Sequence, residues 1–590
     1  MCGIAGYVGG GKAAQIIFSM LKCLEYRGYD SAGIAYVSGG TVKTPKDKGK
    51  VDEVRAKVKP SSIKSHTAVG HTRWATHGVP SKVNSHPHTD CTRRFAVCHN
   101  GIIENHECLR KELKLRGHKF TSQTDTEVIA HLIEEQYDGN LLHAFRNALK
   151  MLEGSFALTL LSSEDPDVIF VARRESPLLI GLGDGENYIA SDAPAFMSYT
   201  KDTVILEDDE YGKVTRDGYA VYDLKTGRRK NKKVVRIDWS FKEAEKSGYR
   251  HFMLKEIHEE PAAARNAFHF DDVELKAMAA DIASSKRIYL VACGTAYHAC
   301  LTGKYVLEKY GIPAEAVVAS EFRYSTADTL GKDSALIVVS QSGETADTLA
   351  AVKKARGRKA HVTSIVNVVG SSITRISDAV IYTRSGPEIA VASTKAYVGQ
   401  LVSLTKLCLH VARKRRGISS LELKKALAEL ESVDVKIESL IDNRKTRKLA
   451  EESVEVRKFF YIGRNINYST ALEGALKLKE ITYLHAEGYA AGELKHGPLA
   501  VIDDDTTVIA VVGDGLLRDK MMSNIQEARA RGARVITVGV GCDVNIPKAM
   551  DVVTPILNIV PLHMFSYYVS VLKGLDPDKP RNLAKSVTVE

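Results

Sequence analysis

The sequence has few aromatic residues, few prolines and no marked excess of charge. Of its 590 residues, 7% are aromatic, 2 are Trp and 16 are Pro, and no basic run has aromatic side chains interleaved for stacking on bases. Nucleic acid is therefore not expected as a partner, although 82 Lys and Arg against 72 Asp and Glu give a net charge of +10. With 44% hydrophobic and 26% charged residues, the composition is typical of an ordinary soluble globular chain and excludes disorder, collagen and coiled coil.

Long apolar runs and cysteine pairs are missing as well. Residues 551–574 are the most apolar stretch, but two Pro, an Asn and a His make them a poor membrane span, and no basic region precedes an apolar run at the amino terminus. Neither a membrane nor a targeting signal is therefore expected. The nine Cys include no Cys-x-x-Cys pair, so neither a disulfide framework nor a zinc site is indicated, and a reducing cytoplasm fits best. Cys2 stands apart because it becomes the first residue once Met1 is removed.

Two kinds of pattern divide the chain. Its length suggests about four structural units at roughly 150 residues each. Up to about residue 240, short β runs such as 156–161 and 168–172 and a few helical patterns such as 127–137 predict an α+β domain with mainly antiparallel strands. A polar segment, Arg228–Arg250, then has the composition of a linker.

The second part of the chain alternates strand and helix patterns. Apolar β-branched runs, each followed by a helical pattern, occur at 287–292, 335–340 and 362–367. This alternation predicts β-α-β units and a parallel sheet. Runs at 459–463 and 509–513 repeat the first two runs at an offset of about 170 residues, which predicts two tandem doubly wound domains.

An amino-terminal cysteine has chemistry that an internal cysteine lacks. Its free α-amine, with a pKa near ~8, can act as general base for the neighbouring thiol, with a pKa near ~8.5. Cys2 could also be a small residue at the start of a buried strand. Asn100 and Gly101 offer an amide and a backbone N–H suited to an oxyanion hole, and Arg73 offers a fork for a carboxylate, which favours the catalytic interpretation.

Six segments resemble the N-terminal-nucleophile glutamine amidotransferases, most closely the glutaminase half of the glutamine–fructose-6-phosphate aminotransferase family. They are Cys2-Gly-Ile, Tyr26-Arg27-Gly-Tyr-Asp30-Ser31, Gly70–Gly78, His86-Pro-His88, His99–Asn105 and Thr124-Asp125-Thr-Glu. The resemblance implies an αββα sandwich in which Cys2 attacks the side-chain amide of glutamine while Asn100 and Gly101 hold the oxyanion. It also implies that Arg73 and Asp125 bind the α-carboxylate and the α-ammonium. Trp74, Thr76 and His77 would line the same pocket.

Each of these residues also has an ordinary structural role open to it. Arg73 could form a surface ion pair, Asp125 could cap a helix, and Trp74 could be a core aromatic, because isolated motif residues often arise by chance. The segments occur in one order over about 125 residues, and that order favours the site.

Loops rich in hydroxyl groups follow the strands predicted in the second part. The carboxyl ends of parallel strands lie beside helix N-termini, whose N–H groups bind anions. Three such loops, at 293–295, 340–345 and 391–394, predict a sugar phosphate site. No Walker lysine accompanies them, so a nucleoside triphosphate is not implied, and helix capping is the alternative for any single loop. The expected ligands are Thr295, Ser340, Gln341, Ser342, Thr345, Val391 and Ser393.

A charged stripe lies on a predicted helix that is otherwise apolar. Glu473, Lys477 and Glu480 fall within an arc of about 60° on a helix that turns about 100° per residue. A solvated ion-pair stripe is common, but a largely buried helix keeps charges only when they are paired or functional. Downstream, His496 lies on a predicted turn, where a capping or core role is the alternative.

These segments and the tail Pro580–Glu590 resemble the isomerase half of the same family. By that resemblance Lys585 forms a Schiff base with the ketose C2, His496 opens the hexose ring, and Glu480 moves a proton between C1 and C2 beside Lys477. A lysine in such a tail can fold over a site, and a plain surface position is the alternative for Lys585.

The sequence thus predicts the conversion of L-glutamine and D-fructose 6-phosphate to L-glutamate and D-glucosamine 6-phosphate, the first step of amino-sugar biosynthesis. Ammonia would pass internally, with Trp74 as a candidate gate. Side chains supply the proton transfer and the imine, so neither a metal nor another cofactor is expected. The resemblance suggests a homodimer with sites completed across subunits. Ala296 departs from the serine of many relatives, so one phosphate contact is missing or comes from water.

The expected domains follow from the same patterns. Their boundaries are 2–240 for the glutaminase domain, 241–252 for a linker, 253–415 and 440–575 for two sugar isomerase (SIS) domains, and 576–590 for the tail with Lys585.

Two other functions stay open at this point. An amidotransferase acting on phosphoribosyl pyrophosphate or aspartate needs a pyrophosphate-binding acidic strand or an ATP-type Ser-Gly-Gly-x-Asp-Ser loop, and neither occurs after residue 250. A sugar phosphate sensor would bind without turnover. Glu480, His496 and Lys585 are the residues that distinguish the enzyme from the sensor.

Overall fold

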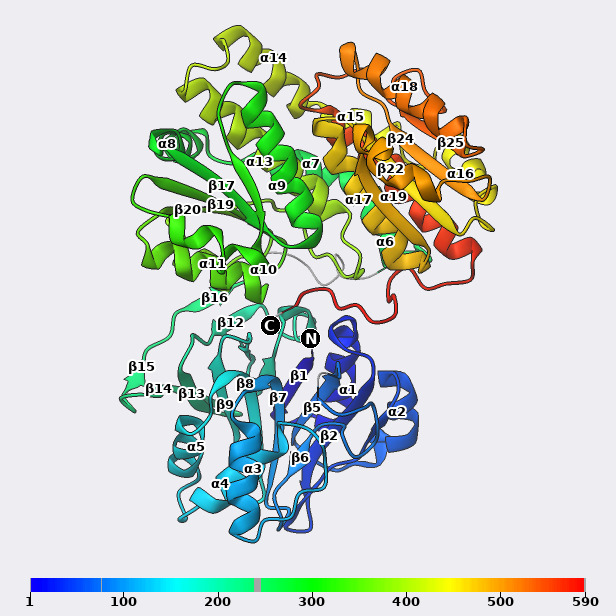
Figure 1. Ribbon diagram of the computed structural model, residues 1–590. Helices are drawn as coiled ribbons and strands as arrows, with labels where there is room; N and C mark the ends of the chain where they lie inside the picture. The colour runs from blue at the N-terminus through cyan, green and yellow to red at the C-terminus, as the bar shows by residue number, and fades with distance from the viewer. Residues whose placement is uncertain (1, 76, 238–245, 588–590) are drawn as a thin grey trace. The chain divides into compact units, whose positions relative to one another are not determined.

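The chain forms two compact units, which the computed structural model describes over residues 2–75, 77–237 and 246–587. The first unit holds the chain up to Ala244 together with the tail from Ala584, and the second unit spans Glu245–Leu583. In Figure 1 most of the first unit is blue to teal and the second runs from green to red.

Two antiparallel sheets build the first unit (Figure 1). The first sheet has the order β16-β12-β10-β11-β1-β5-β2-β3, with β4 paired to β2, and the second has the order β15-β14-β13-β9-β8-β7-β6. The strands of the first sheet are β1 (Gly3–Val8), β2 (Ser31–Ser38), β3 (Thr41–Lys43), β4 (Lys46–Lys48), β5 (Thr67–Arg73), β10 (Leu179–Leu182), β11 (Asn187–Ala190), β12 (Asp202–Ile205) and β16 (Val234–Arg236). Those of the second sheet are β6 (His88–Thr89), β7 (Phe95–Ile103), β8 (Gly154–Ser162), β9 (Ile169–Arg174), β13 (Glu210–Thr215), β14 (Gly218–Asp223) and β15 (Arg229–Lys230).

Alternation along these strands sends side chains into three separate cores. On β1, Ile4 joins the core between the two sheets, while Ala5 joins a core with the helices on the outer face of the first sheet. Phe95 of β7 packs into a third core, with the helices on the outer face of the second sheet. These outer helices are α1 (Ala13–Cys23) and α2 (Val51–Val58) on the first sheet, and α3 (His106–Leu115), α4 (Glu127–Gln136) and α5 (Leu141–Lys150) on the second. The expected αββα sandwich is therefore confirmed.

The polar segment Arg228–Arg250 is not a linker throughout. Its first part forms β15, which pairs with β14, and β16, which pairs with β12. Both are edge strands, hydrogen-bonded to a neighbouring strand on one side only, so their polar side chains can stay in water. Residues 238–245, which include the start of the expected linker 241–252, lie outside the described residues.

Two parallel sheets of the same topology build the second unit (Figure 1). Their orders are β18-β17-β19-β20-β21 and β23-β22-β24-β25-β26. The first sheet consists of β17 (Arg287–Ala292), β18 (Glu315–Val318), β19 (Ser334–Ser340), β20 (His361–Val366) and β21 (Ala379–Tyr382). The second consists of β22 (Lys458–Gly463), β23 (His485–Ala490), β24 (Thr506–Val511), β25 (Arg534–Gly539) and β26 (Val544–Asn545). The predicted repeat and the two doubly wound domains are confirmed, since β22 and β24 take the positions of β17 and β19.

Helices connect and cover these sheets. They are α6 (Phe252–His258), α7 (Glu260–Phe268), α8 (Asp272–Ser284), α9 (Gly294–Lys309), α10 (Ala319–Phe322), α11 (Ala346–Gly357), α12 (Ser372–Ile376), α13 (Lys395–Lys414), α14 (Ser420–Glu431), α15 (Val433–Glu438), α16 (Arg444–Glu451), α17 (Ile466–Thr482), α18 (Leu516–Arg529) and α19 (Thr554–Leu572). α9 follows β17 as α17 follows β22, and these two equivalent helices pack against each other. Residues on both can therefore meet at one site.

α19 is the most apolar helix of the second unit. By length and composition it could cross a membrane, with a mean hydropathy of 1.3, yet 83% of that stretch is buried within the protein. It packs against α17 and α16. Pro561 lies inside this helix, where it removes one backbone hydrogen bond. The apolar stretch is thus the core helix under the second sheet.

Candidate active sites

Cys2 lies directly before β1, beside the end of β5. The antiparallel register pairs Gly3 with Thr72, so Cys2 meets the residues that follow Arg73. The backbone N–H of Trp74 donates to Cys2 Sγ at 3.2 Å. Burial raises the pKa of the Cys2 thiol, although that N–H and the Arg73 guanidinium act in the opposite direction. Near neutral pH the thiol therefore needs a base before it can attack.

Asn100 is oriented toward Cys2 by a buried histidine. His71 on β5 contacts two acceptors with Nε2, the carbonyl oxygen of His99 at 2.9 Å and Oδ1 of Asn100 at 3.0 Å, so Nε2 carries the proton. Burial lowers the pKa of His71 to about 3, which keeps the ring neutral. With Oδ1 held in this way, Asn100 Nδ2 donates to the carbonyl of Cys2 at 3.0 Å. Its second N–H can then serve an oxyanion beside Cys2.

Gly101 follows Asn100 in a conformation that suits glycine alone. Its φ is +130°, and a Cβ there would lie 2.1 Å from the carbonyl oxygen of Ser155 on the neighbouring strand β8. A residue with a Cβ would fit this close approach only if the strand moved. The structure thus brings Cys2, Asn100 and Gly101 together as the sequence predicted.

Arg73 has an unused donor at the same end of β5. Its Nη2 donates to the carbonyl of Gly78 at 3.1 Å and also to that of His77. Nη1 is buried and has no hydrogen-bond partner among the described residues. A buried cationic donor without a partner favours an anion as its ligand.

Asp125 is buried on the loop before α4. Its Oδ2 accepts from the N–H of Ile103 at 2.9 Å and lies 3.9 Å from His99 Nδ1. Trp74 packs edge-on against Tyr29, with ring centroids 5.6 Å apart, and His77 packs edge-on against His106. Thr76, the remaining residue predicted for this pocket, lies outside the described residues.

Sequence reasoning missed two basic residues of this unit, of which His71 supports the site. His71 acts across the two sheets, and Lys46 on β4 donates to the carbonyls of Ser85 and Pro87 at 2.6 and 2.7 Å. Burial lowers the pKa of Lys46 to about 8. A histidine at the centre of an apolar strand, as in Ala68–Arg73, is the signal that could have revealed the first.

The charged stripe of the second unit lies on α17 as predicted, with Glu473 and Lys477 buried and Glu480 partly exposed. Lys477 lies 2.7 Å from Glu480 and 3.4 Å from Glu473, and the exposed fractions of the three side chains are 1%, 20% and 0%. Burial opposes the charge on Lys477, but Glu480 and Glu473 outweigh it and raise its pKa. Glu480 is the member of the triad that reaches the surface of the site.

Thr295 joins this triad from the first turn of α9. Its hydroxyl donates to Glu473 Oε1 at 3.0 Å and accepts from Lys477 Nζ at 3.1 Å. His298, one turn further along α9, contacts Glu473 Oε2 through Nδ1 at 2.6 Å. Although burial alone would raise the pKa of Glu473, Lys477 and His298 hold it below its usual value. Sequence reasoning missed His298, whose signal was its place one helical turn after Thr295.

The second hydroxyl loop lies at the switch point of the first parallel sheet. The chain leaves β17 toward β18 on one side and leaves β19 toward β20 on the other, so the ends of β17 and β19 flank a crevice. Ser340 at the end of β19 accepts from the N–H of Gly343 at 3.0 Å, and Ser342 accepts from that of Glu344 at 3.1 Å. Thr345 is the residue directly before α11, and its side chain makes no capping hydrogen bond to that helix. The structure therefore brings Gln341, between these two serines, to the same crevice as Thr295.

The remaining predicted residues are less closely tied to this triad. Ser393 donates to Glu388 at 2.8 Å, and the N–H of Val391 donates to the carbonyl of Asp578 at 3.1 Å. His496 is exposed at the end of a 3-10 helix, and among the described residues no hydrogen bond or ion pair joins it to α17. Lys585 is half-buried and belongs to the tail that groups with the first unit.

The fold and these sites define a class of protein: a glutamine amidotransferase sandwich joined to two SIS domains. The family model of the glutamine amidotransferase domain matches residues 71–198, and that of the SIS domain matches residues 281–409 and 454–554. Relatives named glutamine–fructose-6-phosphate aminotransferase (isomerizing) from Pyrococcus horikoshii and Thermococcus kodakarensis are 49% and 48% identical, over 100% of both chains. The chain belongs to the family of isomerizing glutamine–fructose-6-phosphate aminotransferases.

A solved structure agrees with this assignment. The C-terminal domain of glucosamine-fructose-6-phosphate aminotransferase from Francisella tularensis is 38% identical, with a TM-score of 0.53, over 57% of this chain and 99% of that chain.

Proposed function

We propose that this chain converts L-glutamine and D-fructose 6-phosphate to L-glutamate and D-glucosamine 6-phosphate, the activity for which its family is named. The observation that supports it best is the charged triad on α17, with Glu473 and Lys477 buried, which meets Thr295 at the crevice of the first SIS sheet. A domain that only bound sugar phosphate would need hydroxyls and helix N-termini there, but not a buried carboxylate and ammonium arranged for proton transfer.

In the glutaminase reaction that we propose, removal of Met1 exposes the α-amine of Cys2. The amine takes the thiol proton, and the thiolate attacks the side-chain carbonyl of glutamine. Asn100 Nδ2 and the N–H of Gly101 hold the oxyanion while the proton passes to the leaving nitrogen, which departs as ammonia. Water then hydrolyses the thioester to glutamate. Arg73 Nη1 binds the α-carboxylate of glutamine and Asp125 binds its α-ammonium.

In the isomerase reaction, His496 assists opening of the fructose 6-phosphate ring, and the Lys585 amine forms an imine at C2 with loss of water. Ammonia displaces Lys585 to give the C2 imine of the sugar. Glu480 removes a proton from C1 and returns one to C2, so that C1 becomes an aldehyde and C2 carries an amine, with no net oxidation. Ser340, Ser342 and Thr345 bind the phosphate at the start of α11.

Borohydride trapping is the direct test of this function. With fructose 6-phosphate present, reduction is expected to leave a secondary amine between the sugar C2 and Lys585 in the wild-type chain, located by peptide mass spectrometry. Lys585→Ala should lose both the adduct and turnover, whereas Lys579→Ala in the same tail should keep both. If Lys585→Ala still binds sugar phosphate and the wild type shows no turnover, the chain is a sensor and not this enzyme.

We further propose a homodimer in which His496 of one subunit completes the isomerase site of the other, because its exposed position leaves it available to a partner. His496→Ala and Glu480→Gln should each be inactive alone. After mixing under exchange conditions, about a quarter of wild-type activity should return, because half of the dimers then carry one intact site. If no activity returns although mass spectrometry detects the mixed dimer, His496 acts within its own chain.

The compartment is also a proposal. All nine cysteines lie in the described part of the chain, and all are free thiols. A reducing compartment such as the cytoplasm is the one in which they would stay so.

A further inference from the structure

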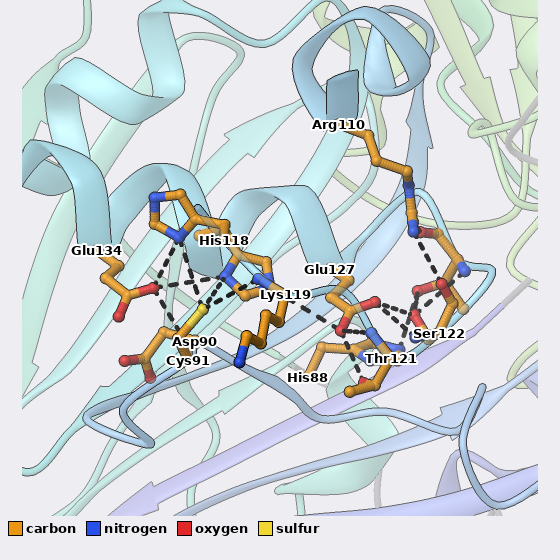
Figure 2. Close-up of polar contacts among 12 residues, drawn as sticks. His88, Asp90, Cys91, Arg110, His118, Lys119, Thr121, Ser122, Glu127 and Glu134 are labelled. Atoms are coloured by element: carbon orange, nitrogen blue, oxygen red, sulfur yellow. Dashed lines mark hydrogen bonds and ion pairs between the residues drawn. The ribbon is translucent and has the colours of Figure 1, made fainter. Parts of the chain in front are cut away.

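Four potential metal ligands from three separate segments meet in the first unit, away from Cys2. Cys91 lies in the turn between β6 and β7, His118 lies in the loop after α3, and His131 and Glu134 lie one turn apart on α4. One donor atom from each of the four lies within 4.8 Å of every other. Figure 2 shows Cys91, His118 and Glu134 directed toward one another. We propose that this cluster binds a structural zinc ion.

The spacing of the four donor atoms fits a tetrahedral ion. Zinc bonds of about 2.3 Å to sulfur and about 2.0–2.1 Å to nitrogen or oxygen put sulfur and nitrogen about 3.5 Å apart, and nitrogen and oxygen about 3.3 Å apart. Cys91 Sγ lies 3.7 Å from His118 Nδ1 and 3.5 Å from His131 Nδ1. Glu134 Oε2 lies 3.0 and 3.5 Å from the same two nitrogens. These four of the six edges of the tetrahedron are within about 0.4 Å of the zinc geometry, and the donor atoms of the other two pairs lie within 4.8 Å of each other.

The surroundings of these ligands also fit a metal better than a hydrogen-bond network. His118 faces carboxylates with both ring nitrogens, Nδ1 toward Glu134 and Nε2 toward Glu135 at 3.1 Å. His131 Nε2 is buried and unbonded among the described residues, and it lies 3.9 Å from Glu127. Each histidine thus turns Nδ1 to the cluster and Nε2 to an outer carboxylate. Metal-bound histidines commonly donate from their outer nitrogen to a second carboxylate; His118 has this arrangement, and His131 Nε2 faces Glu127 at a longer distance.

Two backbone amides and the charges of the ligands also suit a divalent ion. The N–H of Lys119 donates to Cys91 Sγ at 3.4 Å, and the N–H of Cys91 donates to Glu134 Oε2 at 3.2 Å. A thiolate at Cys91 and a carboxylate at Glu134 offset the charge of a divalent ion. Four protein ligands leave no position open for substrate, which is typical of structural and not catalytic zinc. The sequence did not indicate this site because only one of its ligands is a cysteine.

The zinc ion would fix the loop between α3 and α4. Glu127, beside His131, accepts from the N–H groups of Thr121 and Ser122, both at 2.7 Å (Figure 2). Asp125, proposed to bind the α-ammonium of glutamine, lies on the same loop. Loss of zinc should therefore raise the KM for glutamine more than it lowers kcat. This consequence rests on the proposed function, whereas the metal content does not.

Metal analysis of the full-length, untagged protein tests the site. Elemental mass spectrometry is expected to measure about one zinc ion per chain. Cys91→Ala and His118→Gln should lose the zinc ion. Cys108→Ala, which removes a different exposed thiol that lies on α3, should keep the zinc ion. Replacement by Co²⁺ should give tetrahedral absorption with a thiolate charge-transfer band in the wild type and in Cys108→Ala.

Different results of these measurements would contradict the site, the choice of metal or the role of the Asp125 loop. Wild-type protein that holds no zinc and takes up neither Zn²⁺ nor Co²⁺ would overturn the site, as would a Cys91→Ala variant that keeps the thiolate band. Iron or nickel bound in place of zinc would overturn the choice of metal. If Cys91→Ala does not fold, His118→Gln and the wild-type cobalt spectrum still decide. Unchanged glutamine kinetics with zinc lost would count only against the role of the Asp125 loop.

Discussion

Replacing Cys2 with alanine is expected to lower the glutamine-dependent formation of glucosamine 6-phosphate by more than about 10³-fold, because the variant has no nucleophile. Release of glutamate should fall equally. Isomerisation of fructose 6-phosphate to glucose 6-phosphate, which does not use the Cys2 thiol, should stay near the wild-type rate. Coupled enzyme assays of the three products measure these changes.

Cys108→Ala is the matched control, since it removes a thiol from the same unit and leaves Cys2 in place. The glutaminase assignment is wrong if Cys2→Ala makes glucosamine 6-phosphate from glutamine at the wild-type rate. Reaction of Cys2 with iodoacetamide gives a second measurement. Because burial raises the pKa of this thiol, the thiolate is the minor form near pH 7, and the rate should keep increasing as the pH rises past 8.

Replacing Glu480 with glutamine is expected to lower both isomerisation and synthesis by about 10²–10⁴-fold, the usual contribution of a general acid-base group. Glutamine has the shape of glutamate and can still contact Lys477, but it cannot carry a proton from C1 to C2. Glu480 is the better candidate for this base than Glu473. The side chain of Glu473 is fully buried and accepts from Thr295 and His298, whereas that of Glu480 is 20% exposed.

The glutaminase activity of Glu480→Gln should be unchanged, which separates a chemical defect from misfolding. Glu487→Gln is a suitable control, because Glu487 lies on β23 and pairs with Tyr489 instead of Lys477. Proton exchange at C1 in deuterated water, followed by NMR, isolates the step in question. Isomerisation by Glu480→Gln at more than a tenth of the wild-type rate would exclude Glu480 as the base.

Local patterns were enough to predict most of the framework. The run at 287–292 is β17, residue for residue, and the run at 335–340 falls within β19, because a central parallel strand is apolar on both faces. The helix expected from residue 127 is α4. The strands β15 and β16 were missed because polar side chains at a sheet end leave no apolar pattern.

Contacts between distant segments could not be predicted in this way. His71 and Asn100 are 29 residues apart and lie in different sheets, and His298 and Glu473 are 175 residues apart and lie in different SIS domains. Each residue by itself is compatible with a core or surface role. Only the packing of one element on another shows which partner it has.

The sequence by itself determined the family and the αββα sandwich with two doubly wound domains, and it predicted Cys2, Asn100, Lys477 and Glu480 as site residues. It could do so because catalytic motifs and the periods of strands and helices are local properties of the chain. The tertiary structure alone decided that His71 orients Asn100 and that His298 joins the triad on α17. It also decided that Cys91, His118, His131 and Glu134 form one cluster, because a metal site depends on distances in space between side chains that sequence spacing does not set.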